Sequence, residues 1–119
     1  MSAATTITLP FPLSVNNLFA GKSRRYPTRK YVAWRRSADL HVMASRAKRI
    51  KGPVVVSMTL HPADNRRRDA DNCWKAVLDC LVRMQIIDAD DNRVVRKHEA
   101  TWGEKRKPAA AVVTITPVD

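Results

Sequence analysis

The sequence predicts a single α/β domain with the element order β-α-β-α-β-β, in which helices pack on a small mixed sheet. Short β-branched segments alternate with segments whose apolar residues recur every three or four positions, and these two periods indicate strands and helices. Apolar residues make up 45% of the 119 residues and are spread along the chain, which argues against disorder. A chain of this length supports one hydrophobic core, so residues 1–119 form one predicted domain.

The first predicted strand covers residues 5–9, where polar and apolar side chains alternate. Pro10 and Pro12 end its regular pairing, because proline has no backbone donor. Residues 14–17 (Ser-Val-Asn-Asn) are then expected to form a polar loop. In the alternative interpretation, this loop lies beside a phosphate or helps to shape an acidic site.

Basic and aromatic side chains are interleaved between residues 22 and 36. Gly21 and Pro27 favour a mobile loop there over a long helix. Such a loop can hold phosphates and stack on unpaired bases. We assign its nucleic-acid contacts to Arg24, Arg25, Arg29 and Lys30. The alternative is a solvated basic loop whose aromatic residues enter the core.

A helix is predicted from about residue 34 to residue 50, and Gly52 and Pro53 end it. Its expected buried stripe consists of Leu40, Met43, Ala44, Ala47 and Ile50. Residues 54–60 are largely β-branched and apolar, which predicts a central strand. One face of this strand should be less apolar, because it carries Ser57 and Thr59.

The second helix is predicted over residues 71–84. Its apolar face consists of Trp74, Val77, Leu78, Leu81 and Val82. Asp71, Lys75 and Asp79 fall on one flank of this helix, because they are spaced by four residues. Asp71 lies nearest the apolar face, so we expect it to be more buried than Asp79.

Two further strands complete the expected fold. They cover residues 94–102 and residues 113–116, and we expect them to pair as a hairpin through the charged loop at residues 103–108. Cys73 and Cys80 lie roughly 10.5 Å apart along the axis of one predicted helix, which is too far for a disulfide. The two thiols are therefore expected to be buried or half-buried.

The chain is strongly basic, with 22 Lys and Arg residues against 11 Asp and Glu residues, a net charge of +11. Such a charge is typical of a nucleic-acid-binding protein. It would also suit an anionic membrane surface, but the sequence has no long apolar span or lipidation signal. The N-terminal residues lack a signal-peptide pattern, so we expect a cytoplasmic protein.

Acidic residues concentrate between residues 66 and 91, where three arginines come first. The carboxylates of this segment are Asp69, Asp71, Asp79, Asp88, Asp90 and Asp91. Crowded carboxylates repel one another unless a cation lies among them, and short Asp side chains suit Mg²⁺. Alternatively, these residues cap a helix and form turns. The charge pattern favours a metal-dependent enzyme that acts on nucleic-acid phosphates.

These motifs resemble the RusA-type Holliday-junction resolvases. The resemblance is carried by Arg68-Asp69-Ala70-Asp71-Asn72, Lys75, Asp79 and Asp90-Asp91, together with the early segment Pro12-Leu13-Ser14-Val15-Asn16-Asn17. It spans nearly the whole chain, and residues 18–50 are the part without a recognisable motif.

The resemblance implies a homodimeric, bacterial or phage-encoded endonuclease that nicks two strands of a four-way DNA junction symmetrically, in recombination and repair. It implies Mg²⁺, or Mn²⁺ in its place, held by Asp69, Asp71 and Asp91. Lys75 is then the essential basic residue, and Asp79 and Asp90 are supporting groups. Arg66, Arg67 and Arg68 are expected to bind the DNA.

Two other interpretations remain open. The first is a non-catalytic basic protein that binds DNA or RNA and uses its Asp cluster only to cap a helix. The second is a phage- or ribosome-associated assembly protein that uses its charge for packing. Neither would show metal-dependent cleavage.

Overall fold

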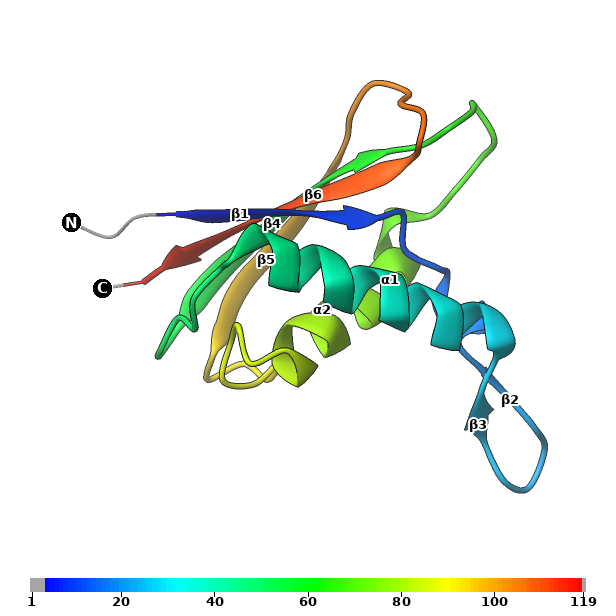
Figure 1. The fold of residues 1–119 in the computed structure, drawn as a ribbon, viewed down its shortest axis with the longest axis horizontal. Helices are drawn as coiled ribbons and strands as arrows, with labels where there is room; N and C mark the ends of the chain where they lie inside the picture. Colours follow the sequence, from blue (N-terminus) through cyan, green and yellow to red (C-terminus); the bar gives the residue numbers. More distant parts are fainter. Residues whose placement is uncertain (1–3, 119) are drawn as a thin grey trace.

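The computed structural model describes residues 4–118 and confirms the predicted mixed α/β class (Figure 1). Its four-stranded sheet has the strand order β1-β6-β4-β5. The strands are β1 (Thr5–Pro10), β4 (Val54–His61), β5 (Val95–Trp102) and β6 (Ala110–Pro117). Two helices, α1 (Arg29–Ser45) and α2 (Trp74–Arg83), pack on it. Shorter elements are η1 (Val15–Asn17), η2 (Ala70–Cys73), β2 (Phe19–Ala20) and β3 (Tyr26–Pro27).

The predicted hairpin between residues 94–102 and 113–116 is wrong. β4 lies between the two strands, parallel to β5 and antiparallel to β6, and β6 also pairs with β1. The crossover through α2 brings β5 parallel to β4, as a helical connection does. The loop after β5 then crosses the end of β4, where the Gly103 N–H donates to the Leu60 carbonyl at 2.8 Å. β6 is therefore an inner strand, and Val113 and Ile115 are fully buried.

The core lies between the helices and one face of the sheet. Along β4, Val54, Val56, Met58 and Leu60 are buried, whereas the alternate residues are partly exposed. This alternation confirms the predicted central strand and its less apolar face. The same core cluster includes residues of β1, β6, α1 and α2, so both helices cover one face of the sheet.

Helix α1 covers Arg29–Ser45, so it begins and ends earlier than the predicted residues 34–50, and it buries a different stripe. The Thr28 hydroxyl accepts a hydrogen bond from the Tyr31 N–H at 3.1 Å and caps the helix. The buried residues are Tyr31, Trp34, Ala38 and Val42. Leu40 and Met43, expected in the core, are each 64% exposed. The prediction fails because the aromatic residues that start the true stripe are interleaved with arginines, a pattern that also fits a basic loop.

Helix α2 starts at Trp74, after the 3-10 turn η2, and not at residue 71. It buries Trp74, Ala76, Val77, Cys80 and Leu81, while Leu78 and Val82 are partly buried against the core. The predicted apolar face is therefore confirmed for the most part, with Ala76 and Cys80 added to it. Both cysteines are free and buried, as expected.

Candidate active site

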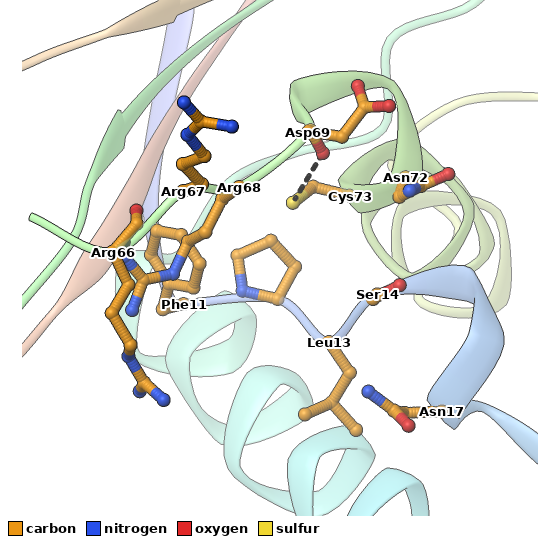
Figure 2. A pocket seen from close by; sticks show the side chains of 11 residues that line it. Phe11, Leu13, Ser14, Asn17, Arg66, Arg67, Arg68, Asp69, Asn72 and Cys73 are labelled. Atoms are coloured by element: carbon orange, nitrogen blue, oxygen red, sulfur yellow. Dashed lines mark hydrogen bonds between the residues drawn. The ribbon is translucent and has the colours of Figure 1, made fainter.

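A polar-lined hollow lies between the segment after β1 and the arginine run before α2 (Figure 2). Its volume is about 500 Å³. The lining residues are Phe11, Pro12, Leu13, Ser14, Asn17, Arg66, Arg67, Arg68, Asp69, Asn72 and Cys73. Two segments distant in the sequence, residues 11–17 and residues 66–73, thus form one cavity, and several of the predicted site residues line it.

Asp69 and Asp71 lie at the entrance to η2. The Asp69 Oδ1 atom accepts a hydrogen bond from the Asp71 N–H at 3.0 Å, so Asp69 caps the turn. This cap uses the backbone of Asp71 and leaves its carboxylate uninvolved. The expectation that Asp71 is more buried than Asp79 is wrong, because Asp71 is exposed and Asp79 is half-buried. Asp71 precedes the regular helix, so helical spacing does not place it on a flank of α2.

Lys75 is held by Asp79. The Lys75 Nζ atom lies 3.2 Å from Asp79 Oδ1, and the buried Tyr31 hydroxyl lies 3.5 Å from Asp79 Oδ2. Asp79 therefore joins a lysine of its own helix to an aromatic residue of α1. The spacing of four residues correctly places Lys75 and Asp79 on one flank of the helix, where such residues can pair, but nothing in the sequence pattern indicated Tyr31.

Asp91 is paired with Arg93. The Arg93 Nη2 atom lies 2.7 Å from Asp91 Oδ2, and the Arg93 Nε and backbone N atoms lie 3.2 and 2.9 Å from Oδ1. These contacts hold the pKa of Asp91 below its usual range, with the side-chain contact as the largest cause. Both carboxylate oxygens are thus occupied by a neighbour in the same turn.

The other two acidic residues of this turn differ in their surroundings. Asp88 accepts a hydrogen bond from the Gly52 N–H at 3.0 Å and from Arg49 Nη2 at 2.6 Å. These contacts lower the pKa of Asp88, the Gly52 contact most. Asp88 therefore connects the loop after α2 to the loop before β4, whereas Asp90 is exposed.

Within residues 4–118, no three His, Cys, Asp or Glu side chains are grouped so that they could hold a metal ion. The structure therefore does not gather Asp69, Asp71 and Asp91 into one cluster. Asp69 and Asp71 fit a hard divalent cation in chemistry, because both are exposed carboxylates two residues apart and Asp69 lines the cavity. Asp91 would have to exchange Arg93 for the cation. The metal-binding role of the three residues stays a prediction.

The three arginines before Asp69 have different environments. The Arg68 Nη2 atom lies 2.9 Å from Asp64 Oδ1, and its guanidinium carbon lies 5.6 Å from the centre of the Phe11 ring. Arg66 has a longer contact of 3.3 Å to Asp64 and is largely exposed, as is Arg67. Arg68 therefore stabilises the loop, and the side chains of Arg66 and Arg67 are exposed to solvent, where an anion can reach them.

The remaining predicted DNA-binding residues surround a hairpin that projects from the body (Figure 1). Arg24 and Arg25 lie in the turn between β2 and β3, and Arg29 and Lys30 open α1. All four are exposed. The turn depends on Gly21, whose φ is +98° and whose missing Cβ would lie 2.2 Å from the Arg24 carbonyl oxygen. The segment is thus a hairpin followed by a helix, in place of the predicted mobile loop.

Comparison with known proteins identifies one family. The family model described as Endodeoxyribonuclease RusA matches residues 10–116. No curated protein matches the chain. Among the helices of residues 4–118, none is long and apolar enough to cross a membrane.

Proposed function

We propose that this chain, which belongs to the RusA endodeoxyribonuclease family, resolves four-way DNA junctions by paired, symmetric, Mg²⁺-dependent nicks in recombination and repair. Family membership implies nuclease activity on Holliday junctions. The observation that supports this chemistry best is the cavity that brings exposed Arg66 and Arg67 together with the Asp69 carboxylate in a chain of net charge +11.

Each site residue has a role that its position supports. Asp69 and Asp71 would hold the cation at the cavity rim, with Asp91 as a third ligand. Bound Mg²⁺, or Mn²⁺, would lower the pKa of the attacking water and offset charge on the scissile phosphate. Lys75, oriented by Asp79, would stabilise the charge that develops on that phosphate. Arg66 and Arg67 would hold neighbouring phosphates.

Two symmetric nicks need two sites, so we propose that the protein acts as a homodimer. A two-fold axis would present one site to each of two strands of like polarity. We further propose that the protein is encoded by a bacterium or a phage and acts in the bacterial cytoplasm, where branched DNA is its partner.

The test is incubation with a synthetic four-way junction labelled on each strand in turn, with and without Mg²⁺. We expect paired nicks at symmetric positions only when Mg²⁺ is present, and a linear duplex of the same sequence should stay intact. Junction binding without cleavage at any Mg²⁺ or Mn²⁺ concentration would favour a non-catalytic nucleic-acid-binding protein. A change in molar mass with concentration, measured by sedimentation, tests the dimer.

Removal of the basic side chains of the β2–β3 hairpin and of the first turn of α1 should weaken DNA binding and reduce its dependence on salt concentration. Changing Arg24, Arg25, Arg29 and Lys30 together to Ala should reduce the slope of log affinity against log salt by about 0.9 for each phosphate that the protein no longer neutralises. Fluorescence anisotropy with a labelled junction measures this slope. The control is a variant with Arg36, Lys48, Lys51 and Lys97 changed to Ala, because these exposed residues carry the same total charge. Equal slopes in the two variants would show that these four residues contribute no more to DNA binding than other exposed basic residues.

Loss of Arg93 should ease metal binding, because Arg93 and a cation compete for the Asp91 carboxylate. An exposed ion pair contributes about 0–1 kcal/mol, so Arg93→Gln should lower the half-saturating Mg²⁺ concentration for cleavage by up to about fivefold. Mn²⁺ titration by electron paramagnetic resonance gives the same comparison without cleavage. Arg96→Gln is the matched control, since Arg96 is exposed and its side chain donates a hydrogen bond to the Asn92 carbonyl, at 3.0 Å, in place of a carboxylate. A shift of the same size in both variants would mean that the Arg93–Asp91 pair does not restrain the site.

A further inference from the structure

The cavity beside Asp69 has one apolar side that none of the proposed roles uses. Pro12 is buried, and Phe11 and Leu13 are partly exposed to the cavity. The backbone of this segment is fixed, because the Trp34 Nε1–H group donates to the carbonyls of Pro10 and Phe11 at 3.2 and 3.0 Å. The apolar side is therefore a preformed surface on which a flat ring could pack.

The arginine run adds a cationic side next to the apolar one, and the Arg68 guanidinium carbon lies 5.6 Å from the centre of the Phe11 ring. Figure 2 shows the arginine run on one side and Ser14, Asn17 and Asn72 on the other. Arg66 and Arg67 are exposed and suit a phosphate. Arg68 is held by Asp64 at 2.9 Å, which keeps the arginine loop in place. The cavity thus offers an anion site within reach of an apolar surface.

Polar side chains complete the lining at its third side. The Ser14 hydroxyl accepts a hydrogen bond from the Asn16 N–H at 3.3 Å and keeps its own hydrogen to donate. Asn17 donates its backbone N–H to the Ser14 carbonyl at 2.9 Å and accepts from the Thr28 hydroxyl at 2.7 Å through its own carbonyl. Its side-chain amide takes part in neither bond and can pair with the edge of a base.

We propose that this cavity binds one unstacked nucleotide of the cleaved strand. The base would pack against Phe11, Pro12 and Leu13, its polar edge would meet Ser14 and Asn17, and its phosphate would lie on Arg66 and Arg67. The volume of about 500 Å³ is within the range of roughly 300–1,000 Å³ found for small-molecule sites. A base inside a duplex is stacked on both faces and cannot enter, so the nucleotide must leave its stack.

This inference rests on the proposed function and adds a selection step to it. The cavity is lined by Asp69 itself, so an occupant would place an adjoining phosphate beside the carboxylates. A nucleotide at a branch point has fewer stacking and pairing contacts to lose than one within a duplex, and its extrusion is correspondingly easier. The cavity would therefore favour branched DNA and, through the polar edge, particular bases at the cut.

The experiment places 2-aminopurine, which fluoresces more strongly when unstacked, at each position flanking the cut in a four-way junction. Wild-type protein is added in metal-free buffer with a chelator, so that binding occurs without cleavage. We expect fluorescence to rise at one position only. Leu13→Ala should abolish that rise and slow cleavage in Mg²⁺ by about tenfold, because stacking contacts of a base are worth roughly this much. Binding measured by anisotropy should change little.

Two further variants test whether the effect of Leu13→Ala is specific to the cavity. Leu40→Ala removes a leucine that is 64% exposed on α1, away from the cavity, and should behave as wild type. Asn17→Ala leaves the apolar side intact and should change the relative cleavage of junctions that differ only at the unstacked base. Thermal unfolding of each variant shows whether a loss reflects misfolding, and Asn17, being exposed, is the safer of the two cavity changes.

Normal junction binding and cleavage with no fluorescence rise at any position, and wild-type rates in Leu13→Ala, would overturn the nucleotide site while leaving the nuclease function standing. A protein that binds the junction without cutting it, but shows the rise, would keep the site and overturn the nuclease mechanism. Absence of junction binding would overturn both, since the proposed occupant is a strand of that junction.

Discussion

Asp71→Asn should abolish junction cleavage and leave junction binding intact or tighter. The structure makes this substitution cleaner than the sequence suggests, because the cap of η2 uses the Asp71 backbone N–H and not its carboxylate. Asparagine preserves that hydrogen bond and removes one negative charge that repels phosphate. If the carboxylate binds Mg²⁺, its loss removes several kcal/mol of transition-state stabilisation, which corresponds to a rate decrease of about 10²- to 10³-fold or more.

The control is Glu104→Gln, which removes the same charge from an exposed residue of the loop between β5 and β6. Cleavage rates are measured under single-turnover conditions in Mg²⁺, and binding is measured by anisotropy with a chelator present. Mn²⁺ binding by paramagnetic resonance provides a second comparison that does not require cleavage. If Asp71→Asn cuts the junction at the wild-type rate in Mg²⁺, the assignment of the site is wrong.

Local interactions explain the parts of the site that could be predicted from the sequence. The capping position of Asp69 follows from its place before a helical segment, and the Lys75–Asp79 contact follows from their spacing of four residues. Both involve neighbours along the chain, so no knowledge of the tertiary structure is needed. The same holds for β4, whose alternation of buried and partly exposed residues is visible in its own eight residues.

Long-range interactions explain the failures. The neighbour predicted for β6 is wrong because the alternation of buried and exposed residues along a strand does not show which strand lies beside it. The neighbour depends on the order in which the chain adds strands to the sheet. In α1, the sequence allows two apolar stripes at helical spacing. The stripe that contains Leu40 and Met43 fits the spacing as well as the buried one, although both residues are exposed. The occupation of Asp91 by Arg93 is local, but in so basic a chain one arginine near an aspartate does not stand out as its partner.

Tyr31 shows how the tertiary structure changes the interpretation of one site residue. Its hydroxyl lies 3.5 Å from Asp79 Oδ2, although the two residues are on different helices. Asp79 is therefore restrained from both α1 and α2, and it can fix the position of Lys75 more firmly than a solvent-exposed pair would. A restrained ammonium group is what stabilisation of a developing charge requires, so substitution of Lys75 is an informative test.

Lys75→Ala should slow cleavage by roughly 10²-fold or more with near-normal junction binding, as expected for the loss of one group that stabilises the transition state. The side chain of Lys75 is 50% exposed, so its removal should change the free energy of unfolding by no more than about 0.5 kcal/mol. Thermal unfolding and single-turnover kinetics separate the two effects. Lys97→Ala is the control, because Lys97 is also exposed and paired with an acidic residue, at 3.5 Å from Glu99.

Lys75→Arg is the sharper test, because it keeps the charge and changes its shape. Arginine replaces a compact ammonium group with a broad planar fork, which can still pair with Asp79 but cannot place its charge at the same point. We expect this variant to bind junctions normally and to cut them poorly. If charge alone mattered, Lys75→Arg would cleave normally and only Lys75→Ala would cleave slowly. Full activity in both variants would make Lys75 a solvated residue of the α2 surface and remove it from the mechanism.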